Sequence, residues 1–188
     1  MIPSKKIGLR FVVASMLLVS SGCSLFTPAP ELSDAEACLK LNAIIADHSG
    51  NFQQFKKSRV NSGGGMGEVI NMQIWRAEKA FPSANNCQVW EWNTGLTNYI
   101  CTWQEKGGEV AAKASHDKGV EIVRQCLNDQ WTSDTVNTQS GGLRTRFSQP
   151  NGKTIIAINA FKESRSLLEN WKATLYVGDK SNLEAEVQ

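Results

Sequence analysis

Hydrophobic and polar residues alternate most regularly near the end of the chain. From Trp171 to Val177, apolar side chains occupy every second position, with polar residues and one tyrosine between them. Alternation of this kind is typical of a strand that has one buried face and one wetter face. The same pattern predicts strands at 143–148 and 153–161, so we expect the chain to close with three antiparallel strands.

A tight turn is expected between the first two of these strands. Asn151-Gly152 is a common sequence of two-residue type I′ hairpins, in which both central residues take positive φ. With that register, Phe147 faces the core, while Arg144 and Arg146 lie on the opposite face of the sheet.

Two segments have the spacing of amphipathic helices. The first runs from Ser33 to about Lys57, with a break at 49–51 and a short helical piece over 52–57. The second runs from Glu109 to Asn128. Between the helices, the sequence predicts a loop in the glycine-rich run and then three strands; these segments are 62–67, 69–77, 88–92 and 96–104. A polar loop at 132–142 follows the second helix.

The order of elements is therefore a helix and three strands, repeated once. This order predicts an α+β domain, with an antiparallel sheet and helices packed on one face. The repetition suggests two α-β-β-β units in tandem, which share their pattern more than their residues.

The N-terminal residues have the layout of an export signal. Three basic residues precede the apolar stretch 11–19, which is too short to cross a bilayer as a helix. Small residues then lead to Cys23. The run 18–23, Leu-Val-Ser-Ser-Gly-Cys, resembles the lipobox of bacterial lipoproteins.

This resemblance implies that the signal peptide, 1–22, is removed and that Cys23 carries acyl chains as a membrane anchor. It also implies an oxidising periplasmic compartment. Ser24 follows the cysteine where aspartate would retain the protein in the inner membrane, so similarity to enterobacterial sorting favours the outer membrane. The tether, 23–32, is short and contains two prolines, which keeps the domain close to the membrane on the periplasmic side.

Removal of the signal changes the charge balance. The chain has 20 Lys and Arg against 18 Asp and Glu, and three of the basic residues lie in the signal. The mature chain therefore has 17 basic and 18 acidic residues, so there is no global basic excess for nucleic acid. Its length suits one domain, which we place at 33–179, before a polar tail at 180–188.

The remaining four cysteines suggest two disulfides, for which the sequence alone allows three pairings. Cys87 and Cys101 lie directly opposite each other if the loop between their strands has three residues and ends in Gly95. Cys38 and Cys126 lie in the two predicted helices, near a start and near an end, so antiparallel packing would bring them together. No CxxC pair occurs and the histidines are far apart in sequence, so we expect no metal and no cofactor.

No catalytic motif stands out. Two runs around His48 and His116 contain the letters of a hydrolase triad. Because neighbouring residues on a helix point in different directions, neither run is expected to form a site by itself. Binding is therefore favoured over catalysis, although an enzyme is not excluded.

Tryptophan is the remaining unusual feature, with six residues. Most of these rings are expected in the core, whereas Trp92 beside the predicted turn is the candidate for exposure. Together with Arg144 and Arg146 it forms our candidate binding surface, since aromatic and arginine side chains dominate protein interfaces. Exposed rings would also suit stacking on the sugars of peptidoglycan.

Three functions follow. The first is a non-enzymatic lipoprotein of the outer membrane that binds a protein partner or acts as an envelope scaffold. The second is an inhibitor or immunity protein against a periplasmic hydrolase, because small disulfide-bonded inhibitors of β-lactamase and lysozyme resemble the chain in size and compartment. The third is a protein that binds or modifies the cell wall.

Overall fold

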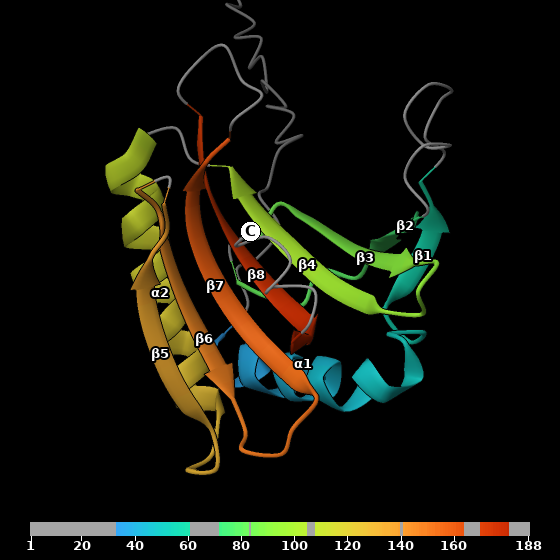
Figure 1. Cartoon of the computed structure of the whole chain (residues 1–188). Coiled ribbons are helices and arrows are strands. Elements are labelled where there is room, and N and C mark those ends of the chain that lie inside the picture. The colour runs from blue at the N-terminus through green and yellow to red at the C-terminus, as the bar shows by residue number, and fades with distance from the viewer. Residues whose placement is uncertain are drawn as a thin grey trace, which may run out of the picture. The chain divides into compact units, whose positions relative to one another are not determined.

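The computed structural model describes residues 33–60, 72–82, 84–104, 108–139, 141–163 and 170–180 (Figure 1). Cys23, the tether, the glycine-rich run 62–67 and nearly all of the tail lie outside these residues. The helices of the described part are α1, Asp34–Asp47, and α2, Gly108–Cys126, with a short 3-10 turn, η1, at His48–Gly50.

Eight strands form one antiparallel sheet in the order β1-β2-β3-β4-β8-β7-β6-β5. Their bounds are β1 Lys56–Arg59, β2 Met72–Ala77, β3 Asn86–Trp92, β4 Thr97–Gln104, β5 Thr132–Asn137, β6 Leu143–Ser148, β7 Thr154–Lys162 and β8 Trp171–Asp179. The fold is therefore α+β with an antiparallel sheet. Each helix is followed by four described strands, so the expectation of three was wrong.

The two additional strands are the edges of the sheet. The sequence predicts a helical piece over 52–57 and a loop over 132–142, and both predictions are wrong. The chain turns sharply at Asn51 and Phe52, which have positive φ, and β1 begins soon afterwards. All six residues of β5 are exposed, so this strand has no apolar alternation and depends on its pairing with β6.

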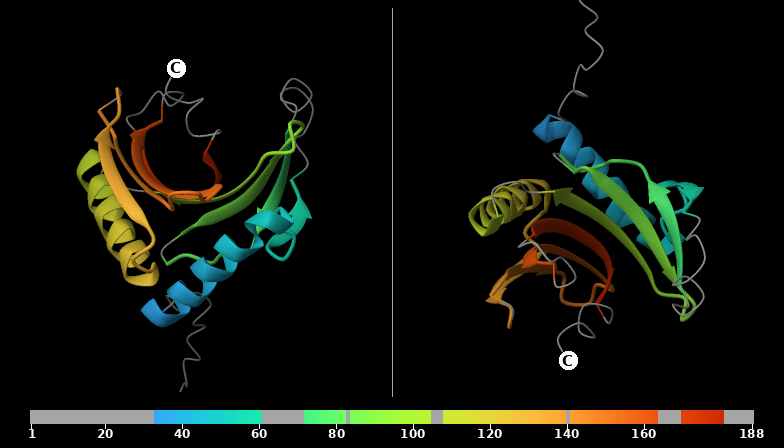
Figure 2. Two further views of the ribbon diagram at one scale, coloured as in Figure 1. Left: turned by 60° about the horizontal axis from the view of Figure 1, so that its bottom comes forward. Right: turned by 90° about the horizontal axis from the view of Figure 1, so that it is seen from above.

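The main core fills the space between one face of the sheet and the two helices. Figure 2 shows the sheet bent into a deep curve with both helices on its outer side. Helix α1 contributes Leu41 and Ile44, α2 contributes Val123, and the sheet contributes alternate residues such as Tyr99 and Leu175. Every second residue of the strands therefore points away from the helices, toward the concave face.

Two disulfides reinforce this arrangement. Cys38 near the start of α1 is bonded to Cys126 at the end of α2, with their Cα atoms 4.8 Å apart. Cys87 is bonded to Cys101 directly across the β3–β4 ladder. Both pairs agree with the sequence argument, and Gly95 in the connecting loop has the expected positive φ of 83°.

The turn between β6 and β7 differs from the type I′ turn expected at Asn151-Gly152. The amide of Gly152 donates to the carbonyl of Gln149 at 3.1 Å, so Pro150 and Asn151 occupy the centre of the turn. Neither Asn151 nor Gly152 is among the described residues with positive φ. Proline fixes φ near −65°, which suits an ordinary turn. The expected register survives, since Phe147 pairs with a β7 residue of the core face.

Candidate functional site

The concave face of the sheet is the candidate site, because it carries all three residues that the sequence proposed as a binding surface. The cross-strand register places Gln88, Ile100, Tyr176, Ala157 and Arg146 in one row over five neighbouring strands. The row runs from β3 through β4, β8 and β7 to β6. It divides naturally into a centre and two flanks.

The centre of the concave face is apolar and tightly packed. Ile155, Ala157 and Tyr176 are buried and form a small cluster, against which half-buried Ile100 packs. This cluster is separate from the core beneath the helices. The flanks are less covered, so they are the part of this face that a partner could contact first.

One flank carries two tryptophans. Trp90 and Trp92 lie on β3 with their ring centroids 6.4 Å apart in an edge-to-face arrangement. The indole N–H of Trp90 donates to Oε1 of Gln88 at 2.8 Å, which orients that ring. Both rings are half-buried, whereas Trp103 and Trp171 are buried beneath the helices. Trp92 is thus neither a core residue nor fully exposed.

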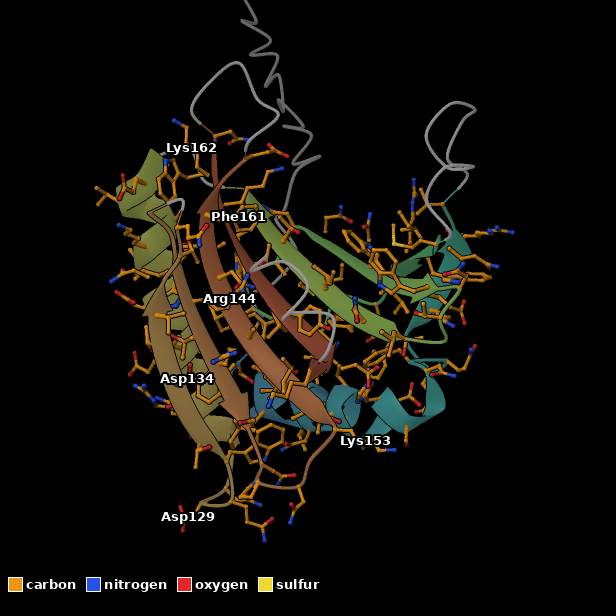
Figure 3. All side chains as sticks on the ribbon, in the orientation of Figure 1. Asp129, Asp134, Arg144, Lys153, Phe161 and Lys162 are labelled. Atoms are coloured by element: carbon orange, nitrogen blue, oxygen red, sulfur yellow. A yellow bond between two sulfur atoms is a disulfide. The ribbon has the colours of Figure 1, made fainter. Side chains whose placement is uncertain are left out.

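The other flank carries two arginines of β6. Nε of Arg144 donates to Oδ1 of Asn159 at 2.8 Å, and Nδ2 of Asn159 donates to the hydroxyl of Thr174 at 3.3 Å. The guanidinium of Arg146 contacts Oδ2 of Asp134 on β5, at 2.9 and 3.3 Å. Figure 3 labels Arg144 and Asp134 on neighbouring strands. Both arginines are half-buried and held by their neighbours.

The structure places Trp92 and the arginines on one face but does not bring them together. Strands β4, β8 and β7 lie between β3 and β6. At about 4.8 Å per strand, the separation along the sheet is roughly 19 Å. The sequence reasoning missed the apolar centre between them. The apolar centre could have been recognised from the run Ile155-Ile156-Ala157-Ile158, which is apolar on both faces of the strand.

Positive charge predominates on the concave face. In all strands except β1, the charged residues that the register assigns to this side are Arg76, Arg144, Arg146, Lys172 and Asp134. Lys172 donates to Glu163, just beyond β7, at 2.7 Å. The hydrogen bonds from Lys172 and Asn170 lower the pKa of Glu163. Two of the four basic side chains are thus paired with carboxylates, Arg146 with Asp134 and Lys172 with Glu163.

Both histidines lie at contacts between a helix and the sheet. His48 is buried, with Nδ1 2.7 Å from the Thr154 hydroxyl and Nε2 3.3 Å from Oδ2 of Asp179. Its ring stacks on Phe52 at a centroid distance of 5.3 Å. These contacts fasten the end of α1 to the ends of β7 and β8.

His116 belongs to a chain of polar contacts between α2 and the sheet. Its Nδ1 lies 2.9 Å from Oδ1 of Asp117, and its Nε2 lies 3.0 Å from the hydroxyl of Thr145. The Asp117 side chain thus folds back to the ring, although neighbouring residues on a helix generally point in different directions. The Thr145 hydroxyl is also bonded to Thr135 at 2.8 Å.

The order of these groups, carboxylate, imidazole and hydroxyl, is that of a hydrolase triad. A nucleophile must nevertheless be reachable, and Thr145 is only 1% exposed. Its oxygen already has two hydrogen-bonded neighbours in the protein. The arrangement is therefore best explained as a clamp that holds α2 on β6.

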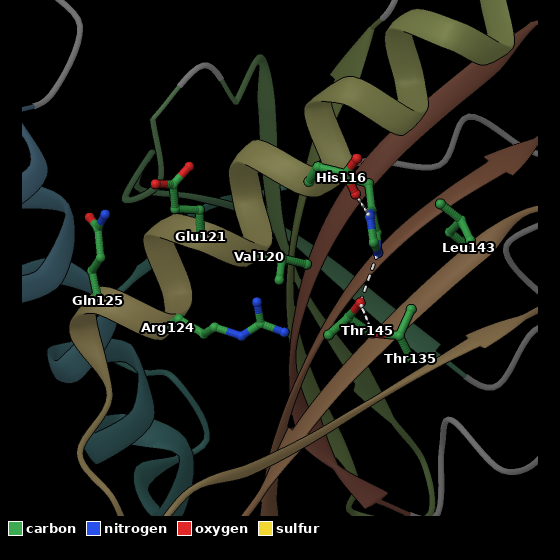
Figure 4. A pocket seen from close by; sticks show the side chains of 9 residues that line it. His116, Val120, Glu121, Arg124, Gln125, Thr135, Leu143 and Thr145 are labelled. Carbon is green, nitrogen blue, oxygen red and sulfur yellow. Dashed lines mark hydrogen bonds and ion pairs between the residues drawn. The ribbon is translucent and has the colours of Figure 1, made fainter.

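A groove of about 540 Å³ lies beside this clamp, between α2 and the strands β5 and β6. Figure 4 shows Val120 and Arg124 pointing from α2 toward the strands, whereas Glu121 and Gln125 point to the other side of the helix. Within the part of the chain that the structure describes, Arg124 has no ion pair or hydrogen bond through its side chain.

Among the residues that the structure describes, titratable groups with shifted pKa values do not converge on one place. Burial is the main reason why the pKa of the Tyr99 hydroxyl is raised. Hydrogen bonds from Ser33 lower the pKa of Glu36 at the start of α1, as those from Lys172 do for Glu163. These groups belong to three separate parts of the fold, unlike the clustered groups of many catalytic centres.

Among the described residues, no group of three or more His, Cys, Asp or Glu side chains could hold a metal ion. Neither of the described helices is long and apolar enough to span a membrane. No known protein family, curated protein or solved structure is detectably similar to this chain.

Proposed function

We propose that this chain is a lipid-anchored periplasmic protein of the outer membrane that binds a protein partner through its concave face. The observation that carries this proposal is the composition of that face. Two tryptophans lie on one flank, two arginines on the other, and a buried apolar cluster lies between them.

Residues of these types supply most of the binding energy in protein interfaces. Tryptophan, tyrosine and arginine are enriched at hot spots, where they become fully desolvated. Here the flanking side chains are already oriented by neighbours, which reduces the entropy lost on binding. The excess of positive charge favours a partner with an acidic surface that is convex enough to enter the curve of the sheet.

The anchor is the second part of the proposal. Acyl chains on Cys23 would hold the protein stably if two or more are attached, because a single chain binds membranes only marginally. The two disulfides are consistent with an oxidising compartment such as the periplasm. Replacement of Cys23 by Ser should release the chain from the membrane fraction.

An inhibitor or immunity role against a periplasmic hydrolase is a specific form of this function. The observation that favours it is the rigidity of the tryptophan flank, since β3 and β4 are joined covalently by Cys87–Cys101. A rigid concave face can cover the active-site region of an enzyme without reorganising. Inhibition of a periplasmic hydrolase by the purified chain would support the inhibitor or immunity role.

The order of the strands also bears on how the concave face is constructed. We propose that it is built from two similar halves, each with one helix and four strands. The order of strands supports this, because β4 and β8 pair at the centre and β1 and β5 form the edges. A two-fold rotation at the central pair would exchange the halves.

Binding of a partner to the concave face can be tested by photocrosslinking in the cells that naturally produce the chain. A photoreactive amino acid is placed at Thr102, which lies on the central strand β4 on the concave side. The matched control position is Leu39, which is 72% exposed on α1. We expect a crosslinked partner from position 102 that Arg144→Glu reduces.

Crosslinks from position 39 but not from position 102 would assign binding to the helical side and reject the proposal. Loss of the crosslink in the Cys23→Ser variant would add that anchoring is needed for the encounter.

A further inference from the structure

The two edges of the sheet are protected to different degrees. β1 has only four residues, three of them basic, and its pairing with β2 contains a register shift between Lys56 and Arg59. Short length, positive charge and bulges are the devices by which proteins prevent edge-to-edge pairing. β5 has none of these devices. It has six residues in unbroken register with β6, and every one is exposed.

The outward-facing backbone groups of β5 can be identified from the adjoining hairpin. The amide of Thr138 donates to the carbonyl of Gly142 at 2.9 Å, so that position pairs toward β6. Hydrogen-bonding positions alternate along an antiparallel ladder. Ser133, Thr135 and Asn137 therefore direct their backbone N–H and C=O groups away from the sheet, where another strand could pair with them.

The groove beside α2 reaches this open edge at Thr135. Thr135 is at once a lining residue of the groove and one of the outward-facing positions. A strand added to β5 would place every second side chain on the helical side of the sheet, next to Val120 and Arg124. Backbone pairing together with pockets for alternate side chains is how extended peptides are recognised at sheet edges.

We propose that β5 binds an extended segment of a partner polypeptide as a ninth strand, with apolar and acidic side chains facing the groove. The apolar side chains would pack on Val120 and Leu143, and a carboxylate would pair with Arg124. This surface is distinct from the concave face, so the inference does not depend on the function proposed above.

A second copy of the chain is a poorer occupant of this edge. In a pairing of β5 with itself, the side chains that face the groove would be Ser133, Thr135 and Asn137. These are small and polar, so they would leave much of the groove unfilled and give Arg124 no carboxylate. The groove therefore favours a strand with larger side chains, apolar beside Val120 and Leu143 and acidic only beside Arg124.

The experiment uses the full chain, extracted in detergent, and a displayed library of nine-residue peptides as the probe. Enriched peptides are synthesised, and their affinities are measured for Ser133→Pro and Ser133→Ala. Proline removes an outward-facing N–H and blocks the edge, whereas alanine keeps the amide. We expect peptides with alternating apolar and acidic positions, whose affinity falls by about tenfold or more with proline and stays unchanged with alanine.

Two further variants make the result specific. Arg124→Ala should reduce the affinity for peptides with an acidic groove-facing residue and leave peptides with glutamine at that position unaffected. Trp92→Ala on the concave face should leave all peptide affinities unchanged. Circular dichroism and melting temperature verify that each variant is folded.

Failure to enrich any peptide, or equal binding to folded Ser133→Pro, would overturn the inference. A dimer of the wild-type chain that Ser133→Pro converts to a monomer would overturn it in favour of self-pairing. Peptide affinities that fall with Trp92→Ala instead would place the binding on the concave face.

Discussion

The hydroxyl of Tyr176 is hydrogen-bonded to Oδ1 of Asn98, 2.9 Å away, across the central pair of strands. The two residues are 6% and 3% exposed. They join β8 to β4, the only place where the first four strands meet the last four in the described sheet. The contact therefore connects the halves of the concave face.

Gly178 lies beside this contact and leaves no room for a side chain. A Cβ at this position would approach Asn98 Oδ1, Tyr176 Oη and the backbone oxygen of Thr97 to within 2.8–2.9 Å. We expect Gly178→Ala to lower the free energy of unfolding by about 1–3 kcal/mol, because the backbone oxygen cannot move aside. The matched control is Gly119→Ala in α2, where a Cβ meets Ile158 at an ordinary 3.4 Å. Urea denaturation should show a loss only for the first variant.

Thr145→Val tests the clamp between α2 and β6. The change keeps the shape of the side chain but leaves buried His116 without its partner on the strand. We expect a loss of about 1–3 kcal/mol in the free energy of unfolding, the usual range for an unsatisfied buried polar group. Thr132→Val on exposed β5 is the control and should change stability by less than about 0.5 kcal/mol. Equal stabilities would show that the clamp contributes nothing.

The two disulfides should differ in their contributions to stability. Cys38–Cys126 joins residues 88 apart in sequence, and Cys87–Cys101 joins residues 14 apart. In the chain-entropy model, these loops correspond to about 4.6 and 3 kcal/mol. Paired Cys→Ala variants should therefore be destabilised more for the first bridge than for the second. Chemical denaturation of both double variants tests which bridge contributes more to the free energy of unfolding. A larger loss for Cys87–Cys101 would show that packing in the folded state outweighs the entropy of the unfolded chain.

Ser33→Ala should raise the pKa of Glu36 toward its usual range. Both the backbone N–H and the hydroxyl of Ser33 donate to the Glu36 carboxylate, at 3.0 and 2.7 Å, and they hold its pKa down. A carboxyl with a lowered folded-state pKa stabilises the fold above its unfolded pKa, and this contribution disappears as the pH falls through the folded value. The variant should therefore lose part of this acid dependence. NMR titration of the side-chain carboxyl resonance measures the pKa of Glu36. An unchanged pKa would show that the backbone N–H of Ser33 alone lowers it.

Trp92→Ala tests whether this ring belongs to a binding face or to the core. Trp92 is half-buried outside the main core, so we expect its replacement to cost clearly less stability than that of Trp103, which is 5% exposed. Trp103→Ala should cost about 3–5 kcal/mol. The partner crosslinked from position 102 should bind Trp92→Ala less tightly. Comparable destabilisation of the two variants would place Trp92 among the core residues.

Segments that bury one face were predictable from the sequence. The bounds of β6 were predicted to the residue, and the pairing of Cys87 with Cys101 follows from the length of one loop. For Cys87 and Cys101, turn chemistry and apolar alternation point to the same register, whereas for β6 the alternation suffices, because the turn expected at Asn151-Gly152 does not form. The segments that were missed, β1 and β5, bury little, so their conformation depends on a neighbouring strand that the local sequence does not show.

The candidate site was predictable only in part. Apolar alternation predicts which face of its strand each of Trp92, Arg144 and Arg146 occupies. The order of the strands in the sheet decides how far apart they lie on that face. The contact of His116 with Thr145 joins residues 29 apart and depends on how α2 lies on β6. Such distances arise from tertiary packing, which neither periodicity nor spacing describes.

The irregular pairing of β1 would limit how large an assembly built through β5 can become. Continuous growth of a sheet requires each molecule to offer two receptive sides, so that every addition creates a new site for the next. A chain with one blocked side and one receptive side ends the series after a single addition. Association through β5 would therefore stop at a fixed one-to-one stoichiometry, and the chain would terminate a fibril rather than extend it.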